Sequence, residues 1–598
     1  MSAQKYSLKQ EPIQTIISWI RSGDLAIPEI QRPFVWSAIK VRDLINSLYS
    51  GFPVGYLIIW RNPTVKLKDG TSSEGKRILI DGQQRVMALM TSLLGKRVVN
   101  KYYKREQLVI AFHPPKKKFE VSNAAIRKDK TWIPDISKVF SLEIKISRLV
   151  RHYCENNPDT DRDEIYESIE LLRGIINNQI GLIELNSDLD IETVTEIFIR
   201  INSKGVVLSQ ADFAMSKIAS NEFFRGNEMR KCIDYFCHLA VDPKFYQKVA
   251  DQDQEFSETA YFQKMSWLKN KHDDLYGPSY TDMLRVAFTS EFKKGRLGVL
   301  VALLTGRNFE TRTYEEAIAE DSFSKLERGL FNFMNETNFN RFLMILRSAG
   351  FIEASMARSQ NAINFAYIVY LVLKSQRIKP SRIESYVRKW FVMSILTSRY
   401  SGSPESVFDT DIRRIDGQDF AEYLHDVESA ELSDAFWDAG LPQKMHTSVA
   451  ISPYFKVYLA AQVYTDDKGF LSRDISVRDL ITHGGNVHHL FPKNYLKKRG
   501  LTKSMYNQIA NYVMMQSDLN IAIRDKAPSA YFTELLSQAS SGKDAYGTIT
   551  NEDQLRNNFT MHCIPDGMND KTIEHYNGFL RERRKLMAQK IKKYYQNL

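Results

Sequence analysis

Two histidines and two asparagines near the C-terminus stand in an order that suits phosphodiester hydrolysis. His488 and His489 end a short strand-like segment in NVHHLFPKNYL, and Pro492 prevents that segment from simply continuing. Asn511 and Asn520 follow within NQIANYVMMQSDLNIAIRDK. Hydrolysis needs a base that takes a proton from water, and a neutral imidazole suits that role at cellular pH. It also needs a hard cation that holds the phosphate oxygens and offsets charge on the leaving group.

These residue types give each side chain a predicted role. We assign His489 as the general base, and His488 and Asn520 as ligands of a divalent metal ion, Mg²⁺ or Mn²⁺. Asn511 is predicted to orient the loop after His489 through hydrogen bonds to its backbone. A pair of histidines alone is more often structural, but the complete set with its spacing favours catalysis. His483 has no partner at a suitable spacing, so we expect it to be exposed to solvent.

Basic residues surround this set. Between Asn486 and Met505 the chain contains five basic residues and no acidic one, and the whole chain has a formal charge of +11. Both features favour a polyanionic partner, although a basic stretch alone is more often a solvated surface. The residues predicted to contact DNA phosphates are Lys493, Lys497, Lys498 and Arg499.

A second polar motif, Asp81-Gly82-Gln83-Gln84-Arg85, lies between a strand-like RILI and a helix-like VMALMTSLLG. Glycine allows a close approach of the backbone, a helix N-terminus offers free N–H groups, and arginine donates two parallel hydrogen bonds, which together suit a phosphate. A short turn capped by Asp81 explains the same residues without any ligand.

The predicted secondary structure around these motifs differs between three regions of the chain. Residues 1–220 alternate strands, predicted at 26–32, 54–60 and 77–80, with helices. One helix is predicted after Ser37 as N-cap, ending at Gly51, with Ile39, Leu44, Ile45 and Leu48 facing inward. Residues 221–470 show mostly amphipathic helical periodicity, and 471–598 combine the histidine motif with a basic terminal helix over 579–595. The predicted fold class is multidomain α+β, predominantly helical, with an α/β domain first.

The C-terminal motifs resemble a known nuclease domain. VHHLFPKNYLKK, the asparagine segment and the ending HCIPDGMNDKTIEHYNGFLRERRKLMAQKI are similar to the C-terminal HNH (ββα-metal) domain of GmrSD-type modification-dependent restriction endonucleases. The commonest HNH form has Asp before the base. This sequence has His488 there, which shifts the expected metal preference toward softer divalent ions.

The N-terminal motifs resemble the other domain of the same family, which is related to the ParB/sulfiredoxin-like fold. IPEIQRPFVW (27–36), DGQQR (81–85) and FIRINSKGVVLS (198–209) occur in the family's order. The resemblance implies a regulatory domain that binds a nucleoside triphosphate, GTP, ATP or another. The residues that would line its pocket are Gln31, Arg32, Asp81, Gly82, Gln83, Gln84, Arg85, Asn202, Lys204 and Gly205.

These patterns predict an NTP-regulated, metal-dependent endonuclease that cleaves modified double-stranded phage DNA as a type IV restriction defence. Two alternatives stay open: a nicking nuclease that senses phosphorothioate-marked DNA, and a nucleotide-switched DNA-binding protein with an inactive nuclease domain. Without a signal-peptide pattern, a membrane-length apolar run or paired cysteines, we expect a cytoplasmic protein with no membrane partner. Self-association into a homodimer is left open by the sequence.

Overall fold

The structure is a computed structural model of the 598-residue chain. It describes residues 5–26, 34, 36–61, 77–100, 105–141, 144–186, 189, 197, 210–219, 221, 223–270, 275–483, 485–541 and 546–598. The chain forms two compact units. The first comprises Met1–Lys271, Gly277–Thr281 and Leu300–Phe323, and the second His272–Tyr276, Asp282–Val299 and Ser324–Leu598.

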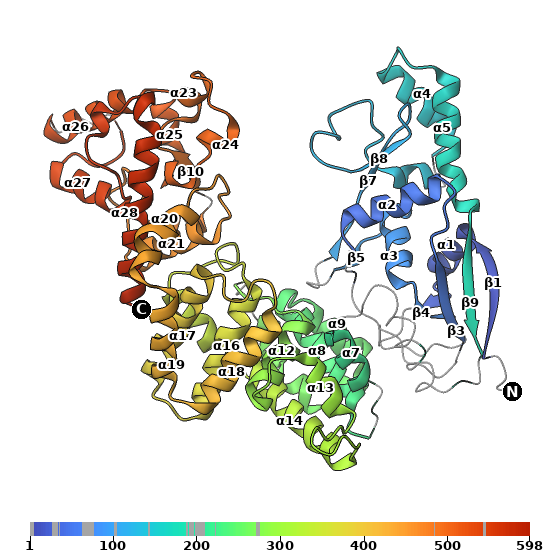
Figure 1. The fold of residues 1–598 in the computed structure, drawn as a ribbon. Coiled ribbons are helices and arrows are strands. Elements are labelled where there is room, and N and C mark those ends of the chain that lie inside the picture. The colour runs from blue at the N-terminus through green and yellow to red at the C-terminus, as the bar shows by residue number, and fades with distance from the viewer. Residues whose placement is uncertain are drawn as a thin grey trace. The chain divides into compact units, whose positions relative to one another are not determined.

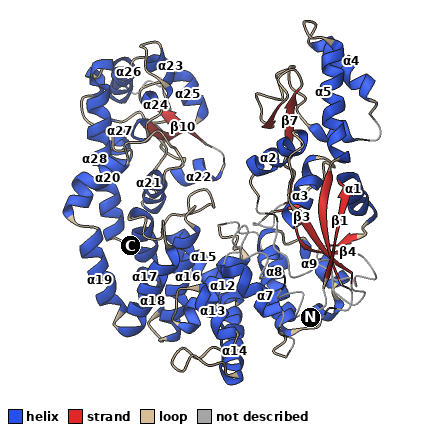
Figure 2. Ribbon diagram, turned by 45° about the vertical axis from the view of Figure 1, so that its right-hand side comes forward, coloured by secondary structure: helices blue, strands red, loops and turns tan. Residues whose placement is uncertain are grey.

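A mixed five-stranded sheet organises the first unit (Figure 2). Its strands are β1 (Tyr6–Pro12), β2 (Leu25–Ala26), β3 (Tyr56–Arg61), β4 (Arg77–Asp81) and β9 (Gln179–Leu185), in the order β1-β9-β3-β4-β2. β3 pairs in parallel with β9 and antiparallel with β4. Consecutive residues of β3 and β4 are buried on opposite faces of the sheet. Burial on both faces explains why LIIW and the ILI of residues 78–80 are continuous apolar runs. The structure confirms these two predicted strands as β3 and β4.

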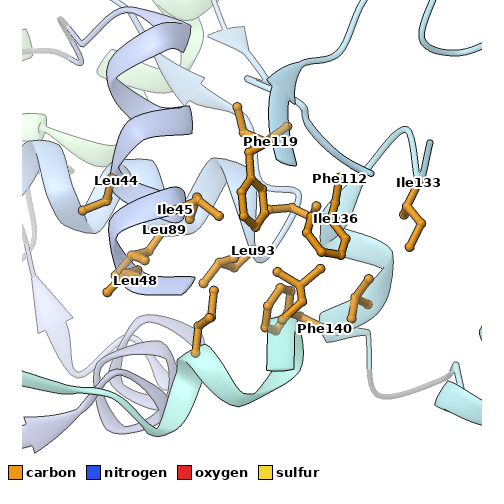
Figure 3. Close-up of a cluster of buried hydrophobic side chains, with 14 of the residues drawn as sticks. Leu44, Ile45, Leu48, Leu89, Leu93, Phe112, Phe119, Ile133, Ile136 and Phe140 are labelled. Carbon is orange, nitrogen blue, oxygen red and sulfur yellow. The ribbon is translucent and has the colours of Figure 1, made fainter. Parts of the chain in front are cut away.

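A separate apolar core lies beside this sheet and includes α2 (Ala38–Tyr49) and α3 (Gln83–Ser92). Figure 3 shows Leu44, Ile45 and Leu48 of α2 and Leu89 of α3 in one cluster with Phe112, Phe119 and Phe140. Ser37 caps α2 by accepting a hydrogen bond from the Lys40 backbone N–H, as predicted. The prediction that Ile39 faces inward is wrong, since its side chain is 56% exposed. The buried face of α2 begins at Val41, and Ile39 lies off it by helical rotation.

The first unit contains further helices and strands. They are α1 (Ile13–Ser22), β5 (Val98–Val99), β6 (Arg105–Glu106), β7 (Ile110–His113), β8 (Lys118–Val121), η1 (Ile136–Phe140), α4 (Ile146–Asn156), α5 (Arg162–Gly174), η2 (Ile175–Asn177), α7 (Gln210–Ala219), α8 (Gly226–Val241), α9 (Phe245–Gln252), α10 (Gln254–Ser257), α11 (Ala260–Lys264) and η3 (Ser266–Asn270). The helices α12 (Tyr280–Phe292), α13 (Leu297–Leu304) and α14 (Glu316–Met334) include residues of both units.

The second unit is mostly helical. Its elements before the histidine motif are α15 (Glu336–Ser348), α16 (Gln360–Ser375), α17 (Pro380–Leu396), α18 (Pro404–Gly417), α19 (Phe420–Glu431), η4 (Phe436–Gly440), α20 (Leu441–Lys444), α21 (Pro453–Tyr464) and α22 (Val477–Thr482). Every residue from Ala362 to Leu373 of α16 is buried, as expected for a central helix of a bundle. No helix among the described residues has the length and apolar character to cross a membrane. The predominantly helical α+β class is therefore confirmed.

The C-terminal part of this unit, whose helices Figure 1 shows, contains two paired strands and a helix that follows the second strand. β10 (Asn486–His489) pairs antiparallel with β11 (Tyr512–Met515), and α25 (Ser517–Ile523) follows β11 almost directly. The elements around them are α23 (Lys493–Lys497), α24 (Lys503–Tyr506), η5 (Ile509–Asn511), α26 (Pro528–Ser541), α27 (Glu552–Met561), η6 (Met568–Asp570), η7 (Ile573–His575) and α28 (Tyr576–Gln596). The predicted terminal helix is present as α28.

Candidate functional site

The β10–β11 hairpin gives the two adjacent histidines different surroundings. His488 lies opposite Val513 and His489 opposite Tyr512 in the antiparallel register. Successive side chains of a strand point to opposite faces of the sheet, so the two imidazoles cannot share one set of neighbours. Both residues nevertheless line the same pocket at the end of the hairpin.

His488 is buried, with 6% of its surface exposed. Its Nε2 atom is buried and has no hydrogen-bond partner among the described residues. Burial, followed by the nearby His489, lowers the pKa of His488, and the Met515 backbone and the Asn520 side chain offset only part of this shift. A neutral ring with a free, buried nitrogen is the state in which histidine binds metal ions.

His489 has a defined hydrogen-bond partner. Its Nε2 lies 3.0 Å from Oδ1 of Asn507, and its ring packs edge-on against Tyr512 at a centroid distance of 5.1 Å. Burial lowers the pKa of His489, and Lys493 lowers it further, while the bond to Asn507 acts in the opposite direction. The imidazole is therefore neutral at cellular pH, as a general base must be.

Asn511 joins the two sides of the loop that follows His489. Its side chain is fully buried, with Oδ1 accepting from the Phe491 N–H at 2.8 Å and Nδ2 donating to the Phe491 carbonyl at 3.1 Å. Its backbone carbonyl accepts a further bond from the Leu490 N–H at 2.8 Å. Asn511 thus makes the loop contacts that its predicted orienting role requires.

Two buried side chains from later in the chain support this loop, and sequence spacing indicated neither contact. The Tyr531 hydroxyl donates to the Leu490 carbonyl at 2.7 Å. Arg583 of α28 is completely buried and donates to the Ala510 carbonyl at 2.7 Å and to the His562 carbonyl at 3.0 Å. The closing helix therefore holds the residue that precedes Asn511.

The pocket has a volume of about 780 Å³ and a mixed polar and apolar lining. The lining residues are Val487, His488, His489, Pro492, Lys493, Asn494, Asn520, Ile521, Arg524 and Asp525. The structure thus brings His488, His489 and Asn520 together, as their predicted roles need. The volume of this pocket is sufficient for a small polar group such as a phosphate.

The four basic residues predicted to contact DNA do not all lie at the pocket. Lys493 lines the pocket, whereas Lys497, Lys498 and Arg499 do not. Lys498 pairs with Asp525, and the Arg499 guanidinium lies 3.6 Å from the Tyr495 ring centroid. His483 is exposed, as predicted.

Arg524 is a pocket residue that sequence reasoning missed. It is exposed and follows Asn520 by four residues at the end of α25. Residues four apart lie on the same side of a helix, and this spacing was the available signal. Arg524 and Lys493 give the pocket two cationic side chains suited to a phosphate.

The residues present fit a metal ion held by few protein ligands. The described part of the chain contains no group of three or more His, Cys, Asp or Glu side chains placed to hold a metal. His488 with its unpaired Nε2 and the exposed amide of Asn520 are the donors available in this pocket. A hard cation such as Mg²⁺ commonly keeps several waters and binds substrate phosphate oxygens, so two protein ligands are compatible with it.

The DGQQR motif forms the turn between β4 and α3 in the first unit. Gly82 has a positive φ of 93°, and a Cβ atom there would lie 2.3 Å from Cδ2 of Leu57, so the backbone conformation and the close approach of Leu57 both favour glycine without any ligand. Arg85 donates to the Tyr56 carbonyl at 2.8 Å, and its guanidinium lies 4.0 Å from the Asp81 carboxylate. Part of this arginine's hydrogen-bonding capacity therefore joins α3 to β3.

The two glutamines of the motif are buried at the start of α3, with 6% and 8% of their surfaces exposed. Gln84 accepts a hydrogen bond from the Trp36 backbone N–H at 3.3 Å, and Gln83 contacts the Met87 sulfur. The remaining residues predicted for this pocket lie outside the described residues: Gln31, Arg32, Asn202, Lys204 and Gly205.

Comparison with known families concerns this same N-terminal region. Residues 13–219 match the family model described as "GmrSD restriction endonuclease, N-terminal domain". This part of the chain is therefore similar to a GmrSD N-terminal domain. Strands β2, β3, β4 and β9 and the DGQQR turn lie within the matched residues. The match supports a restriction endonuclease acting on DNA.

A full-length relative extends beyond the GmrSD domain. An uncharacterized protein of Methanocaldococcus jannaschii is 20% identical over 627 aligned positions, which cover 95% of this chain and 96% of the relative. The alignment therefore includes the helical region and the C-terminal part as well as the GmrSD domain.

Proposed function

We propose that this protein is a divalent-metal-dependent DNA endonuclease, with its active site in the C-terminal ββα segment. One observation carries the proposal: the buried, unpaired Nε2 of His488 lies in one pocket with Asn520 and His489. A buried polar atom without a partner is costly, about 1–3 kcal/mol, unless a ligand satisfies it. A metal ion bound by His488 and Asn520 would remove this cost.

The chain's own residues supply the rest of the chemistry. His489 accepts a proton from the attacking water, while Asn511 fixes the loop that follows His489. Lys493 and Arg524 bind phosphate oxygens at the pocket rim. A bound metal ion would supply electrostatic stabilisation of the charge that develops on the phosphate and the leaving oxygen.

The biological role we propose is restriction of foreign DNA that carries a chemical modification, with NTP bound by the N-terminal domain as regulator. The GmrSD domain supports the role in restriction. The DGQQR turn lies at the N-terminus of α3 and carries Arg85, and both features suit a phosphate group, which supports nucleotide binding at this turn.

A cleavage assay tests the proposed function directly. Purified protein is incubated with Mg²⁺ or Mn²⁺, with and without each NTP, on modified and unmodified phage DNA. We expect metal-dependent cleavage of modified DNA that changes with NTP. Single-strand nicks confined to phosphorothioate-marked DNA would favour the nicking nuclease instead. DNA binding without cleavage under any of these conditions would favour an inactive nuclease domain.

Replacing Asn520 with alanine should raise the metal concentration needed for half-maximal cleavage. Groups that merely orient metal ligands contribute about 10–100-fold to affinity, so loss of a direct ligand should cost at least about 10-fold. Cleavage rates measured across a Mg²⁺ or Mn²⁺ titration give this value. Asp518→Ala, on the exposed surface of the same helix, serves as the matched control and should titrate like the parent. An unchanged metal requirement for Asn520→Ala would exclude it as a ligand.

Replacing Asp81 or Arg85 with alanine should weaken nucleotide binding and make cleavage insensitive to added NTP. Binding of each NTP is measured by calorimetry and cleavage by gel assay. Because Arg85 also bonds to the Tyr56 carbonyl, the melting temperature of each variant is compared with the parent. Asp24→Ala, an exposed acidic residue of the same domain, is the control. If both variants are stable and bind nucleotide as the parent does, DGQQR is only a structural turn.

A further inference from the structure

Asn507 is a polar residue beside the active site to which no function has been given so far. Its Oδ1 lies 3.0 Å from His489 Nε2, and a carbonyl oxygen can only accept a hydrogen bond. His489 Nε2 must therefore carry the hydrogen. In a neutral imidazole the lone pair then resides on Nδ1, which makes no hydrogen bond with any residue that the structure describes.

The segment that carries Asn507 is fixed from several directions. The Asn507 backbone N–H donates to the Lys503 carbonyl at 3.1 Å and closes α24. The preceding carbonyl, of Tyr506, accepts a hydrogen bond from Nδ2 of Asn511 at 3.3 Å. The Tyr576 hydroxyl of α28 donates to the Met505 carbonyl at 3.0 Å. Asn507 is thus held in position by residues other than His489.

The ring of His489 is restricted in the same way. Tyr512 contacts it edge-on at 89°, and Tyr506 lies at a centroid distance of 6.4 Å. Aromatic neighbours limit rotation of the ring but do not determine which nitrogen is protonated. The hydrogen bond to Oδ1 of Asn507 determines the tautomer.

We propose that Asn507 is a positioning residue that holds His489 as the Nε2–H tautomer, so that Nδ1 accepts the proton from the attacking water. This inference rests on the proposed nuclease function. The water oxygen forms the new bond to phosphorus as its proton passes to Nδ1. The bond from phosphorus to the leaving sugar oxygen breaks, and that oxygen takes a proton from solvent. Throughout this step Asn507 continues to accept the Nε2–H bond.

Two substitutions of Asn507 separate its acceptor atom from its volume. Asn507→Leu keeps a similar size without an acceptor, and Asn507→Asp keeps the acceptor. We expect Asn507→Leu to lower kcat by at least about 10-fold, up to the ~10⁴-fold that a mis-set histidine tautomer can cost, with KM for DNA unchanged. Asn507→Asp should restore most of kcat. Ser504→Ala, on the exposed side of α24, should behave like the parent.

Nitrogen NMR of full-length protein with ¹⁵N-labelled histidine reads the tautomer directly, with the His489 signals assigned by their loss in His489→Ala. We expect a protonated Nε2 in the parent and in Asn507→Asp, and a mixture of tautomers in Asn507→Leu. A parent ring protonated at Nδ1 would overturn the proposal, as would Asn507→Leu with parental kcat. A kcat for Asn507→Asp as low as that of Asn507→Leu would also overturn it. The NMR measurement does not require cleavage, so failure of the nuclease function is distinguishable from failure of this inference.

Discussion

Replacing His489 with alanine should lower the rate of DNA cleavage by about 10²–10⁴-fold, the usual contribution of a general base. The ring lies in the pocket with His488 and Asn520, and its lowered pKa keeps it neutral and able to accept a proton. Alanine removes the proton acceptor without adding volume, so folding and DNA binding should stay close to those of the parent. The measurement is a single-turnover cleavage rate at saturating metal, together with a DNA-binding isotherm and a melting curve.

The control for this experiment is His483→Ala. His483 is exposed, follows α22 and lies outside the pocket lining, so its removal should leave the cleavage rate unchanged. If well-folded His489→Ala protein cleaves DNA at a near-parental rate, His489 is not the base.

Replacing Arg583 with methionine should destabilise the second unit by about 2–5 kcal/mol and abolish most cleavage. Two effects oppose each other at this site. Burial lowers the pKa of Arg583, which shows that its charge is costly to bury, and methionine would remove that cost. The carbonyls of Ala510 and His562 would, however, each lose a buried donor, at about 1–3 kcal/mol apiece. We expect the loss of these hydrogen bonds to dominate.

The loss of cleavage follows from the position of Ala510, directly before Asn511. Without Arg583 the Ala510 carbonyl loses a hydrogen bond that restrains the backbone. Asn511 then shifts, and so does the loop after His489 to which its side chain is bonded. Urea unfolding and cleavage rate are measured together. Arg581→Met is the matched control, because Arg581 is exposed on the same helix and should change stability by no more than about 0.5 kcal/mol. Parental stability and cleavage in Arg583→Met would show that α28 does not support the site.

Part of the fold could be predicted because it depends on local pattern. The helix after Ser37 and the strands LIIW and RILI follow from capping and apolar runs, and the structure has all three. Ile39 was misplaced because helical periodicity gives the spacing of a buried face but not where that face begins. Packing of α2 against Phe119 and its neighbours sets that direction.

The order of His488, His489, Asn511 and Asn520 along the chain was sufficient to select the candidate site. Strand alternation and the short step from β11 to α25 are local properties, so sequence alone could bring these residues near one another. Local sequence pattern does not indicate which basic residues line the pocket. That depends on ion-pair partners such as Asp525, which pairs with Lys498.

Only the tertiary structure decided which atoms these residues contact. Asn507 reaches His489 because the segment before β11 packs across the end of the hairpin. Arg583 reaches the Ala510 carbonyl from a helix more than seventy residues farther along the chain. Sequence spacing fixes neighbours along one strand or one helix turn, whereas hydrogen bonds between distant segments depend on how whole elements pack. For this reason the sequence determined the chemical types at the site, and the packing of α24 and α28 decided their geometry.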